Sequence, residues 1–245
     1  MAETKTAPAI EVPNIIVALS GRPKSGKNYF AYTFPEPIKV YCFNGGASFV
    51  ARKFPKKKID VQNFTLPIVD STTEQWALPV WTEFYAQYNA DVESGKYKTL
   101  VLDCSTEVEQ FCRQAVLEEL QDEASTKGRV KQKLATNEYL ARNLRMNAIF
   151  ARARNAGLNL VSLQYLKPEW VKTPGTDRAE PTGKMEVDGW NQVEAQADIN
   201  IWIEAKMKGD EAEMISTIKP SRFVRKQYVL TDIGYDDLLA VVLEE

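Results

Sequence analysis

The segment Gly21–Asn28, in which two glycines enclose four residues and a lysine follows the second, constrains this chain most. It reads GRPKSGKN, with the apolar run Ile15–Leu19 directly before it and a helix-like start, Tyr29–Tyr32, directly after it. A strand, a glycine-bounded loop and a helix start form the setting in which Gly-x4-Gly-Lys binds nucleotide phosphates. The alternative interpretation is an ordinary glycine turn.

A phosphate-binding loop works because several backbone N–H groups converge on one anion. Glycines at both ends permit that curl, and the start of the helix adds its positive pole. The Lys27 ammonium would then lie against the β- and γ-phosphates. The segment therefore predicts these nucleotide-binding residues: Gly21, Arg22, Pro23, Lys24, Ser25, Gly26, Lys27, Asn28 and Tyr29.

The residue after the lysine departs from the motif. Ser or Thr normally stands there and ligates Mg²⁺ through its hydroxyl, whereas this chain has Asn28. An amide oxygen can ligate a hard cation, but the longer, planar side chain places that oxygen differently. We expect nucleotide binding to tolerate this change better than hydrolysis does.

A second landmark is the strand-like segment Lys98–Asp103, which ends in an aspartate. Ligands of parallel sheets bind at the carboxyl ends of the strands, and an aspartate at this place holds Mg²⁺ in phosphate-loop proteins. Asn28 and Asp103 are therefore the candidate metal ligands; the alternative for Asp103 is an exposed residue at a strand end. Glu107, one helical turn further on, is a candidate base or a partner of the first helical turn.

Strand-like and helix-like segments alternate along the chain and predict an α/β fold with a mostly parallel sheet, flanking helices and an antiparallel C-terminal hairpin. The expected strands after the phosphate loop are Ile38–Phe43, Lys98–Asp103, Leu158–Gln164, Ile199–Ile203 and Met214–Ile218. The expected later helices run from Pro79 to Val92, from about Thr136 to Gly157 with Leu140, Leu144 and Phe150 buried, and from Asp236 to Leu243. We expect a flexible tail at residues 1–13 and one domain over residues 14–245.

The composition excludes several classes of function. The chain has no histidine, which excludes Ser-His-Asp and Cys-His catalysis and nearly all zinc enzymes. Phosphoryl transfer needs none, because it depends on positioning and charge neutralisation. The three cysteines form no Cys-x2-Cys pair, as expected for reduced thiols. Because the chain has neither an apolar run of membrane length nor a hydrophobic signal core, we expect a cytoplasmic protein without membrane contact.

The segment Lys127–Arg154 differs from the rest of the chain in charge. It has eight basic residues and one acid, Glu138, within a protein of net charge -2. Such an asymmetry indicates nucleic acid, nucleotide phosphates or an acidic neighbouring subunit as a partner; the alternative is a solvated helix face. The candidate DNA-binding residues here are Arg142, Arg145, Arg152 and Arg154.

Gln164 ends a buried strand and is a candidate sensor of the γ-phosphate. After it, the proline- and glycine-rich segment Tyr165–Trp190 predicts a long loop, and loops of this length are usually functional or disordered. Its candidate DNA contacts are Lys167, Trp170 and Lys172, and both Trp170 and Trp190 could stack on bases. With four basic residues against five acids, DNA contact here rests on position rather than on charge.

The order of these landmarks resembles the phage-encoded RecA-like ATPases, the AAA-domain recombination and annealing proteins of the Sak type. The likeness runs from about Asn14 to Leu243, through GRPKSGK with FPEP, Gly45-Gly46, TLVLDCST, NLVSLQ and DGWNQVEAQADINIWIEA. It implies a RecA-like P-loop NTPase core that uses ATP and Mg²⁺ and assembles into a ring or filament. It also implies single-stranded DNA as the partner in recombination or replication, in the host-cell cytoplasm.

The resemblance also bears on individual residues. Lys27, Asp103, Glu107 and Gln164 are the candidate catalytic residues, and Lys219 or Arg222 could reach a neighbouring subunit's nucleotide as a trans-acting cation. The segment after Gln164 falls where RecA-like proteins carry a DNA loop. Relatives tend to have an acid near Asn44 that polarises the attacking water. Amides at both Asn28 and Asn44 therefore predict weak hydrolysis, unless Glu107 substitutes.

Two other hypotheses remain open. One is a degenerate P-loop domain that serves as a structural or assembly module without turnover. The other is a small-molecule kinase that clamps phosphates with its basic helix. Salt-dependent binding to oligonucleotides would distinguish the DNA-binding ATPase from the structural module. Phosphate transfer to an added acceptor would identify a kinase.

Overall fold

The structure is a computed structural model that describes residues 14–67, 75–125, 133–172 and 178–244. The predicted flexible tail at residues 1–13 lies outside the described residues. So do three of the eight basic residues of the segment Lys127–Arg154, namely Lys127, Arg129 and Lys131.

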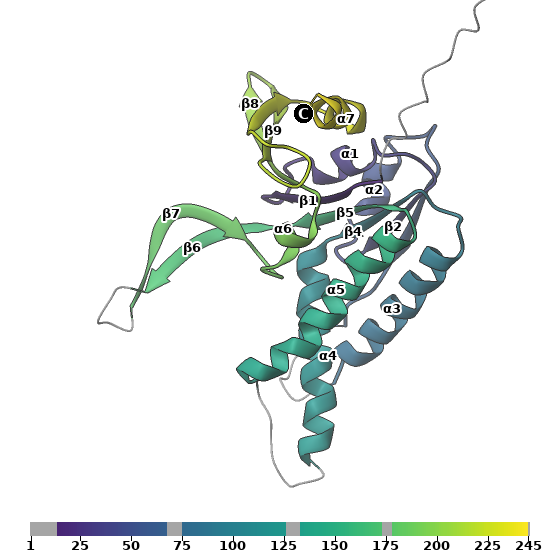
Figure 1. The fold of residues 1–245 in the computed structure, drawn as a ribbon, viewed down its shortest axis with the longest axis vertical. Coiled ribbons are helices and arrows are strands. Elements are labelled where there is room, and N and C mark those ends of the chain that lie inside the picture. The colour runs from purple at the N-terminus through teal and green to yellow at the C-terminus, as the bar shows by residue number, and fades with distance from the viewer. Residues whose placement is uncertain (1–13, 68–74, 126–132, 173–177, 245) are drawn as a thin grey trace, which may run out of the picture.

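One eight-stranded sheet organises the chain (Figure 1), in the strand order β10-β9-β8-β1-β5-β4-β2-β3. Neighbouring strands from β8 to β3 run parallel. Their bounds are β1 Ile16–Gly21, β2 Ile38–Cys42, β3 Ile59–Asn63, β4 Thr99–Asp103, β5 Asn159–Gln164 and β8 Ile199–Lys208. Because parallel strands end at a common edge, β1, β4 and β5 bring their carboxyl ends together.

Two antiparallel strands extend the sheet beyond β8. They are β9, Glu211–Lys219, and β10, Tyr228–Thr231, and we call β8, β9 and β10 together the C-terminal strands. The predicted fold class, a mostly parallel sheet with flanking helices and an antiparallel C-terminal hairpin, is therefore confirmed.

Helices cover both faces of the sheet and divide the core in two (Figure 1). One face carries α3 Ala77–Glu93, α4 Ser105–Ser125 and α5 Tyr139–Asn155; the other carries α1 Lys27–Ala31, α2 Ala47–Ala51 and α7 Tyr235–Leu243. A 3-10 turn, Thr136–Glu138, precedes α5, and the short α6, Val193–Gln196, precedes β8. Successive residues of β1 alternate between the two cores, Ile16 in one and Val17 in the other, as the pleat of a strand requires.

The predicted buried face of α5 is partly wrong. Phe150 is buried, but Leu140 and Leu144 are 62% and 60% exposed. The buried stripe consists of Met146, Ile149, Phe150 and Ala153. Leu140 lies nine residues before Ile149, as Leu144 does before Ala153, and nine residues correspond to two and a half turns of a helix. Both leucines therefore lie on the side of α5 opposite its core-facing stripe.

The predicted long loop over Tyr165–Trp190 is also wrong. Its chain forms two antiparallel strands, β6 Leu166–Lys172 and β7 Ala179–Val187, which extend away from the main sheet in Figure 1. We call this ribbon the projecting hairpin. Pro168 and Pro181 read as loop signals in the sequence, but a two-stranded ribbon leaves each strand an unpaired edge where proline is tolerated.

Trp190, expected as a base-stacking residue, is instead part of the core. Its side chain is 2% exposed, packs at 5.5 Å from the Phe150 ring, and donates from Nε1 to Asn143 Oδ1 at 3.1 Å. A buried indole whose N–H already has an acceptor is a structural group. The stacking role assigned to Trp190 is therefore wrong.

Candidate functional site

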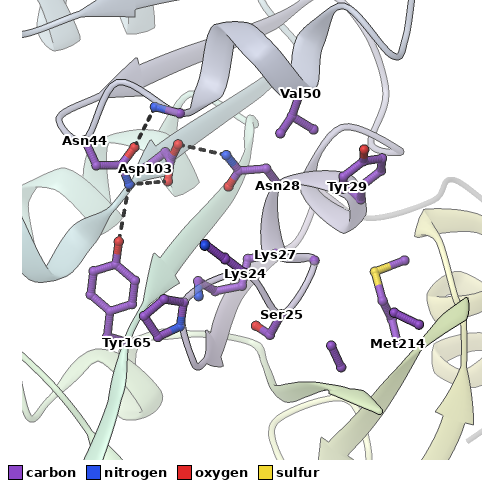
Figure 2. Close-up of a pocket in the computed structure, with 15 residues that line it drawn as sticks. Lys24, Ser25, Lys27, Asn28, Tyr29, Asn44, Val50, Asp103, Tyr165 and Met214 are labelled. Atoms are coloured by element: carbon purple, nitrogen blue, oxygen red, sulfur yellow. Dashed lines mark hydrogen bonds between the residues drawn. The ribbon is translucent and has the colours of Figure 1, made fainter. Parts of the chain in front are cut away.

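A cavity of about 740 Å³ opens at the carboxyl ends of β1, β4 and β5 (Figure 2). The phosphate loop forms one wall and the C-terminal strands form another. The lining residues are Pro23, Lys24, Ser25, Gly26, Lys27, Asn28, Tyr29, Asn44, Gly46, Val50, Asp103, Tyr165, Ala205, Ala212 and Met214. Of the nine residues predicted to bind nucleotide, seven line it; Gly21 and Arg22 contribute through their carbonyl groups.

Close contacts with β8 and β9 leave no room for a side chain at Gly21 or Gly26. A Cβ on Gly21 would lie 2.5 Å from the carbonyl oxygen of Ile203 on the neighbouring strand. Gly26 has φ 89°, and a Cβ there would lie 2.0 Å from Met214 Sδ. The loop can thus curl closely against β8 and β9 only because neither position carries a side chain.

Lys27 stands at the centre of the loop. Its Nζ donates to the carbonyl oxygens of Gly21 at 2.9 Å and Arg22 at 2.8 Å, and lies 4.8 Å from the centroid of the Tyr165 ring. An ammonium has three donors, so one N–H remains for an anion. Burial lowers the pKa of Lys27, while the charge of Asp103 opposes that shift.

Asp103, 2% exposed at the end of β4, is held by two amides. Asn28 Nδ2 donates to its Oδ2 at 2.9 Å, and Asn44 Nδ2 donates to its Oδ1 at 3.3 Å, as Figure 2 shows. Burial raises the pKa of Asp103, and the hydrogen bonds from both asparagines oppose the rise. The structure thus brings the predicted pair Asn28 and Asp103 together, but through the amide nitrogen rather than the amide oxygen.

Two other candidate catalytic residues lie outside the lining. Gln164 is buried within the sheet, where its Oε1 accepts from Ser20 Oγ at 3.1 Å and its Nε2 donates to Ser162 Oγ at 2.7 Å. Glu107 accepts from the Cys104 thiol, and burial raises the pKa of its carboxyl group. The structure does not bring the Gln164 side chain to the cavity.

Tyr165, the residue after Gln164, takes the place expected for that side chain. Its ring lines the cavity, and its hydroxyl lies 3.4 Å from Asn44 Nδ2. The sequence held a signal for this residue, since it directly follows the carboxyl end of a buried strand. Residues alternate between the faces of a strand, so the neighbour of a buried side chain can face the ligand.

The residues of the cavity suit a nucleoside triphosphate better than they suit Mg²⁺. The triphosphate fits: besides the free donor of Lys27, Ser25 Oγ is buried and has no hydrogen-bond partner among the described residues. The metal does not fit. Both Asp103 oxygens accept hydrogen bonds from amides, and Asn28 presents an amide nitrogen, which cannot ligate a cation, where a phosphate loop normally has a hydroxyl.

The arginines of α5 expected to contact DNA are bound within the chain. The contacts are Arg142–Glu109 at 2.7 Å, Arg145–Glu119 at 2.6 Å, Arg154–Asp198 at 3.4 Å and Arg152–Tyr85 at 3.2 Å. Neighbouring carboxylates therefore balance the charges of Arg142, Arg145 and Arg154, whereas Arg152 is exposed and bonds to the neutral Tyr85 hydroxyl.

The two candidate trans-acting cations also have partners. Lys219 Nζ lies 2.9 Å from Glu194 and 3.5 Å from the centroid of the Trp202 ring, and Arg222 lies 2.9 Å from Asp198. Lys219 pairs with Asn200 near the start of β8. Since β8 runs parallel to β1, this is the edge of the sheet opposite to the phosphate loop of the same chain.

The projecting hairpin begins beside the cavity. The backbone N–H of Tyr165 donates to Thr106 Oγ1 at 3.2 Å, and that hydroxyl donates to the carbonyl of Asp188 at 3.0 Å. Trp170, 58% exposed, and Lys172 lie further out on β6. Lys167 is exposed and lies 3.3 Å from Asp188. The hairpin is thus anchored to α4, three residues after Asp103.

A phosphate loop between β1 and α1, with Lys27 in the same cavity as an aspartate at the end of β4, defines a P-loop NTPase domain. The chain belongs to the AAA domain family, which matches residues 13–229.

Comparison with known proteins adds a distant structural likeness. A KaiC-like protein from the hyperthermophilic archaeon Pyrococcus horikoshii OT3 is similar at 16% sequence identity over 88% of this chain and 84% of that chain, with a TM-score of 0.46. No curated protein matches the chain. Within the described residues, no helix has both the length and the apolar character that crossing a membrane requires.

Proposed function

We propose that this protein binds ATP and acts with single-stranded DNA in phage recombination or replication, with weak hydrolysis. The observation that carries the proposal is the cavity at the carboxyl edge of the sheet, walled by the phosphate loop with the Lys27 ammonium at its centre. Assembly into a ring or filament, and a place in the cytoplasm of the host cell, belong to the same proposal.

The support for ATP binding is a pair of hydrogen-bond donors in the phosphate loop that are available to an anion. Lys27 has a third N–H donor, and Ser25 Oγ is buried without a described partner. Such groups lower the energy of a bound triphosphate by charge-assisted hydrogen bonds. Beyond the loop the lining is largely apolar, with Val50, Ala205 and Met214, which suits the base of a nucleotide.

The support for weak hydrolysis lies in Asn28 and Asn44. Both amides donate to Asp103, which is the only carboxylate among the residues that line the cavity. An amide cannot accept a proton from an attacking water as a carboxylate does. The described lining therefore offers no free general base for ATP hydrolysis.

The support for DNA lies in the projecting hairpin. It presents the exposed ring of Trp170 and the exposed Lys172 on the same strand, and aromatic rings with nearby cations bind single strands. Its base contacts Thr106 and continues from Tyr165, which lines the cavity. One continuous segment would thus contact the nucleotide at its start, Tyr165, and DNA further out on β6.

The proposal for self-association keeps Lys219 and Arg222 as trans-acting cations. Each would exchange its present partner, Glu194 or Asp198, for the phosphates of a neighbouring subunit. Arg222 has a largely exposed side chain, and Asp198, which is 4% exposed, would keep its contacts with Arg154 and the backbone N–H of Ile16 after such an exchange.

A second candidate function is a structural or assembly module that keeps the P-loop fold without turnover. The engagement of both Asp103 oxygens by amides favours it. That reading predicts no salt-dependent affinity for oligonucleotides, whereas the DNA-binding reading predicts affinity that falls as salt rises.

The test of ATP binding is the variant Lys27→Ala, measured by titration calorimetry with ATP. Loss of charged hydrogen bonds should weaken binding by about 10- to 100-fold, equivalent to about 1.5–3 kcal/mol. Lys56→Ala removes an exposed lysine outside the cavity and should bind as the wild type does. Equal affinity in the Lys27 variant would refute the assignment of the phosphate loop.

A further inference from the structure

We propose that the site binds ATP without requiring Mg²⁺, because the Asn28 amide satisfies Asp103 in the way a metal ion otherwise would. The inference rests on the proposed ATP binding. It concerns the one place where the loop departs from its motif, Asn28 in place of Ser or Thr.

The orientation of Asn28 follows from chemistry as well as from geometry. Asp103 at the end of β4, when ionised, can only accept hydrogen bonds, so an amide 2.9 Å from its Oδ2 must turn its NH₂ group toward it. An amide nitrogen has no free lone pair for a cation. The group that replaces the usual hydroxyl ligand therefore cannot ligate a metal in this orientation.

The second oxygen of Asp103 is held in the same way, by an amide whose orientation is fixed independently. Asn44 Oδ1 accepts from the backbone N–H of Gly46 at 3.0 Å, so Asn44 Nδ2 faces Asp103 Oδ1 at 3.3 Å. A metal approaching Asp103, which is itself 2% exposed, would have to displace both hydrogen bonds. The half-buried Asn28 amide would lose its acceptor, which costs free energy, whereas the exposed Asn44 amide could turn to water.

Charge balance explains how ATP can be held without the metal. A bound Mg²⁺ ordinarily offsets the negative charge of the aspartate and of the phosphates. Here two amide dipoles point into the carboxylate, and the Lys27 ammonium lines the same cavity as Asp103. Fixed dipoles and one cation thus perform the neutralisation.

The expected property is an ATP affinity that hardly changes with Mg²⁺. In the full-length wild type, calorimetric titration with ATP in MgCl₂ and in EDTA at matched ionic strength should give Kd values within about threefold of each other. Asn28→Thr frees Asp103 Oδ2 and adds a hydroxyl ligand, so Mg²⁺ should tighten ATP binding by about tenfold or more in that variant.

Two further variants make the comparison specific. Asn155→Thr makes the same substitution at an exposed position at the end of α5 and should behave as the wild type. Asn28→Ser supplies the hydroxyl without a β-branched side chain, so it replaces Asn28→Thr if thermal unfolding shows that the threonine variant is poorly folded.

The outcomes distinguish this inference from the proposed function. Wild-type binding that weakens about tenfold or more in EDTA overturns the inference and leaves ATP binding intact. Asn28 variants that stay indifferent to Mg²⁺ overturn the role assigned to the amide. A wild type that binds ATP no more tightly than Lys27→Ala in either buffer overturns the proposed function itself.

Discussion

At the scale of single residues, two buried serines near the cavity differ in one respect. Ser20 Oγ donates to Gln164 Oε1 at 3.1 Å, whereas Ser25 Oγ has no partner among the described residues. A buried polar atom without a partner carries the full cost of its lost hydration. The buried Ser25 hydroxyl therefore lowers the free energy of unfolding of the nucleotide-free protein.

This contrast predicts that serine-to-alanine substitutions at the two positions affect the free energy of unfolding differently. Ser25→Ala should leave the free energy of unfolding unchanged or raise it, since it removes an unsatisfied hydroxyl. Ser20→Ala should lower that free energy by about 1–3 kcal/mol, because it leaves the Gln164 carbonyl oxygen without its donor. Urea unfolding monitored by circular dichroism measures both, and an equal loss in the two variants would contradict the prediction.

The residues of the site could be predicted only as far as their spacing carries information. Lys27, Asn28 and Asp103 follow from the glycine pattern and from a strand that ends in an acid, and the structure brings them together. Which atom of Asn28 faces Asp103 depends on the orientation of an amide, and no sequence pattern encodes that. The contribution of Asn44 depends likewise on its bond to Gly46.

At the scale of elements, apolar runs made the buried strands predictable. The segments Leu158–Gln164 and Lys98–Asp103 correspond to β5 and β4, which are buried along their whole length. The strands β3 and β10 escaped prediction because each is only partly buried; β3 has no apolar run, and β10 is only four residues long. An edge strand derives its position from its neighbour's hydrogen bonds more than from its own side chains.

The projecting hairpin supplies the prediction at this scale. Trp170→Ala should weaken binding to single-stranded oligothymidine by about 5- to 100-fold, since one stacked base contributes about 1–3 kcal/mol. Val171→Ala is the matched control, because this neighbour is similarly exposed at 53% but has no ring to stack. Fluorescence anisotropy over a series of salt concentrations measures both.

The two variants have distinct implications. Equal losses in both would indicate that the hairpin contributes only bulk apolar surface. Wild-type affinity in both would move the DNA site away from β6, toward the basic residues of α5, such as the exposed Arg152.

At the scale of the whole molecule, the two ends of the described fold meet at the cavity. The phosphate loop lies near the start of the chain, while Ala205, Ala212 and Met214 come from the C-terminal strands. A ligand held between them stabilises both parts together. The arrangement could not be predicted from the sequence, because it depends on β8 pairing with β1 across the entire chain length.

Global unfolding should therefore respond to ATP as one unit. ATP at 100 times its Kd should raise the free energy of unfolding by about 2.7 kcal/mol, in the presence of EDTA as well as of Mg²⁺. At the same ATP concentration, Lys27→Ala should reduce the rise to about 0.4–1.4 kcal/mol, as its 10- to 100-fold weaker binding implies. Urea titrations followed by tryptophan fluorescence and by circular dichroism provide the measurement, and a shift seen by only one of the two probes would contradict the prediction.

The contact between Gly26 and Met214 has a consequence for the protein as it is made. The loop leaves the ribosome before β9 does, and N-terminal parts of a chain begin to fold first. Because Met214 of β9 lines the cavity beside the loop, the cavity is complete only after β9 has been synthesised and has paired with β8. Under the proposed function, the growing polypeptide therefore gains its ability to bind the triphosphate at that stage of translation and not when the loop itself emerges.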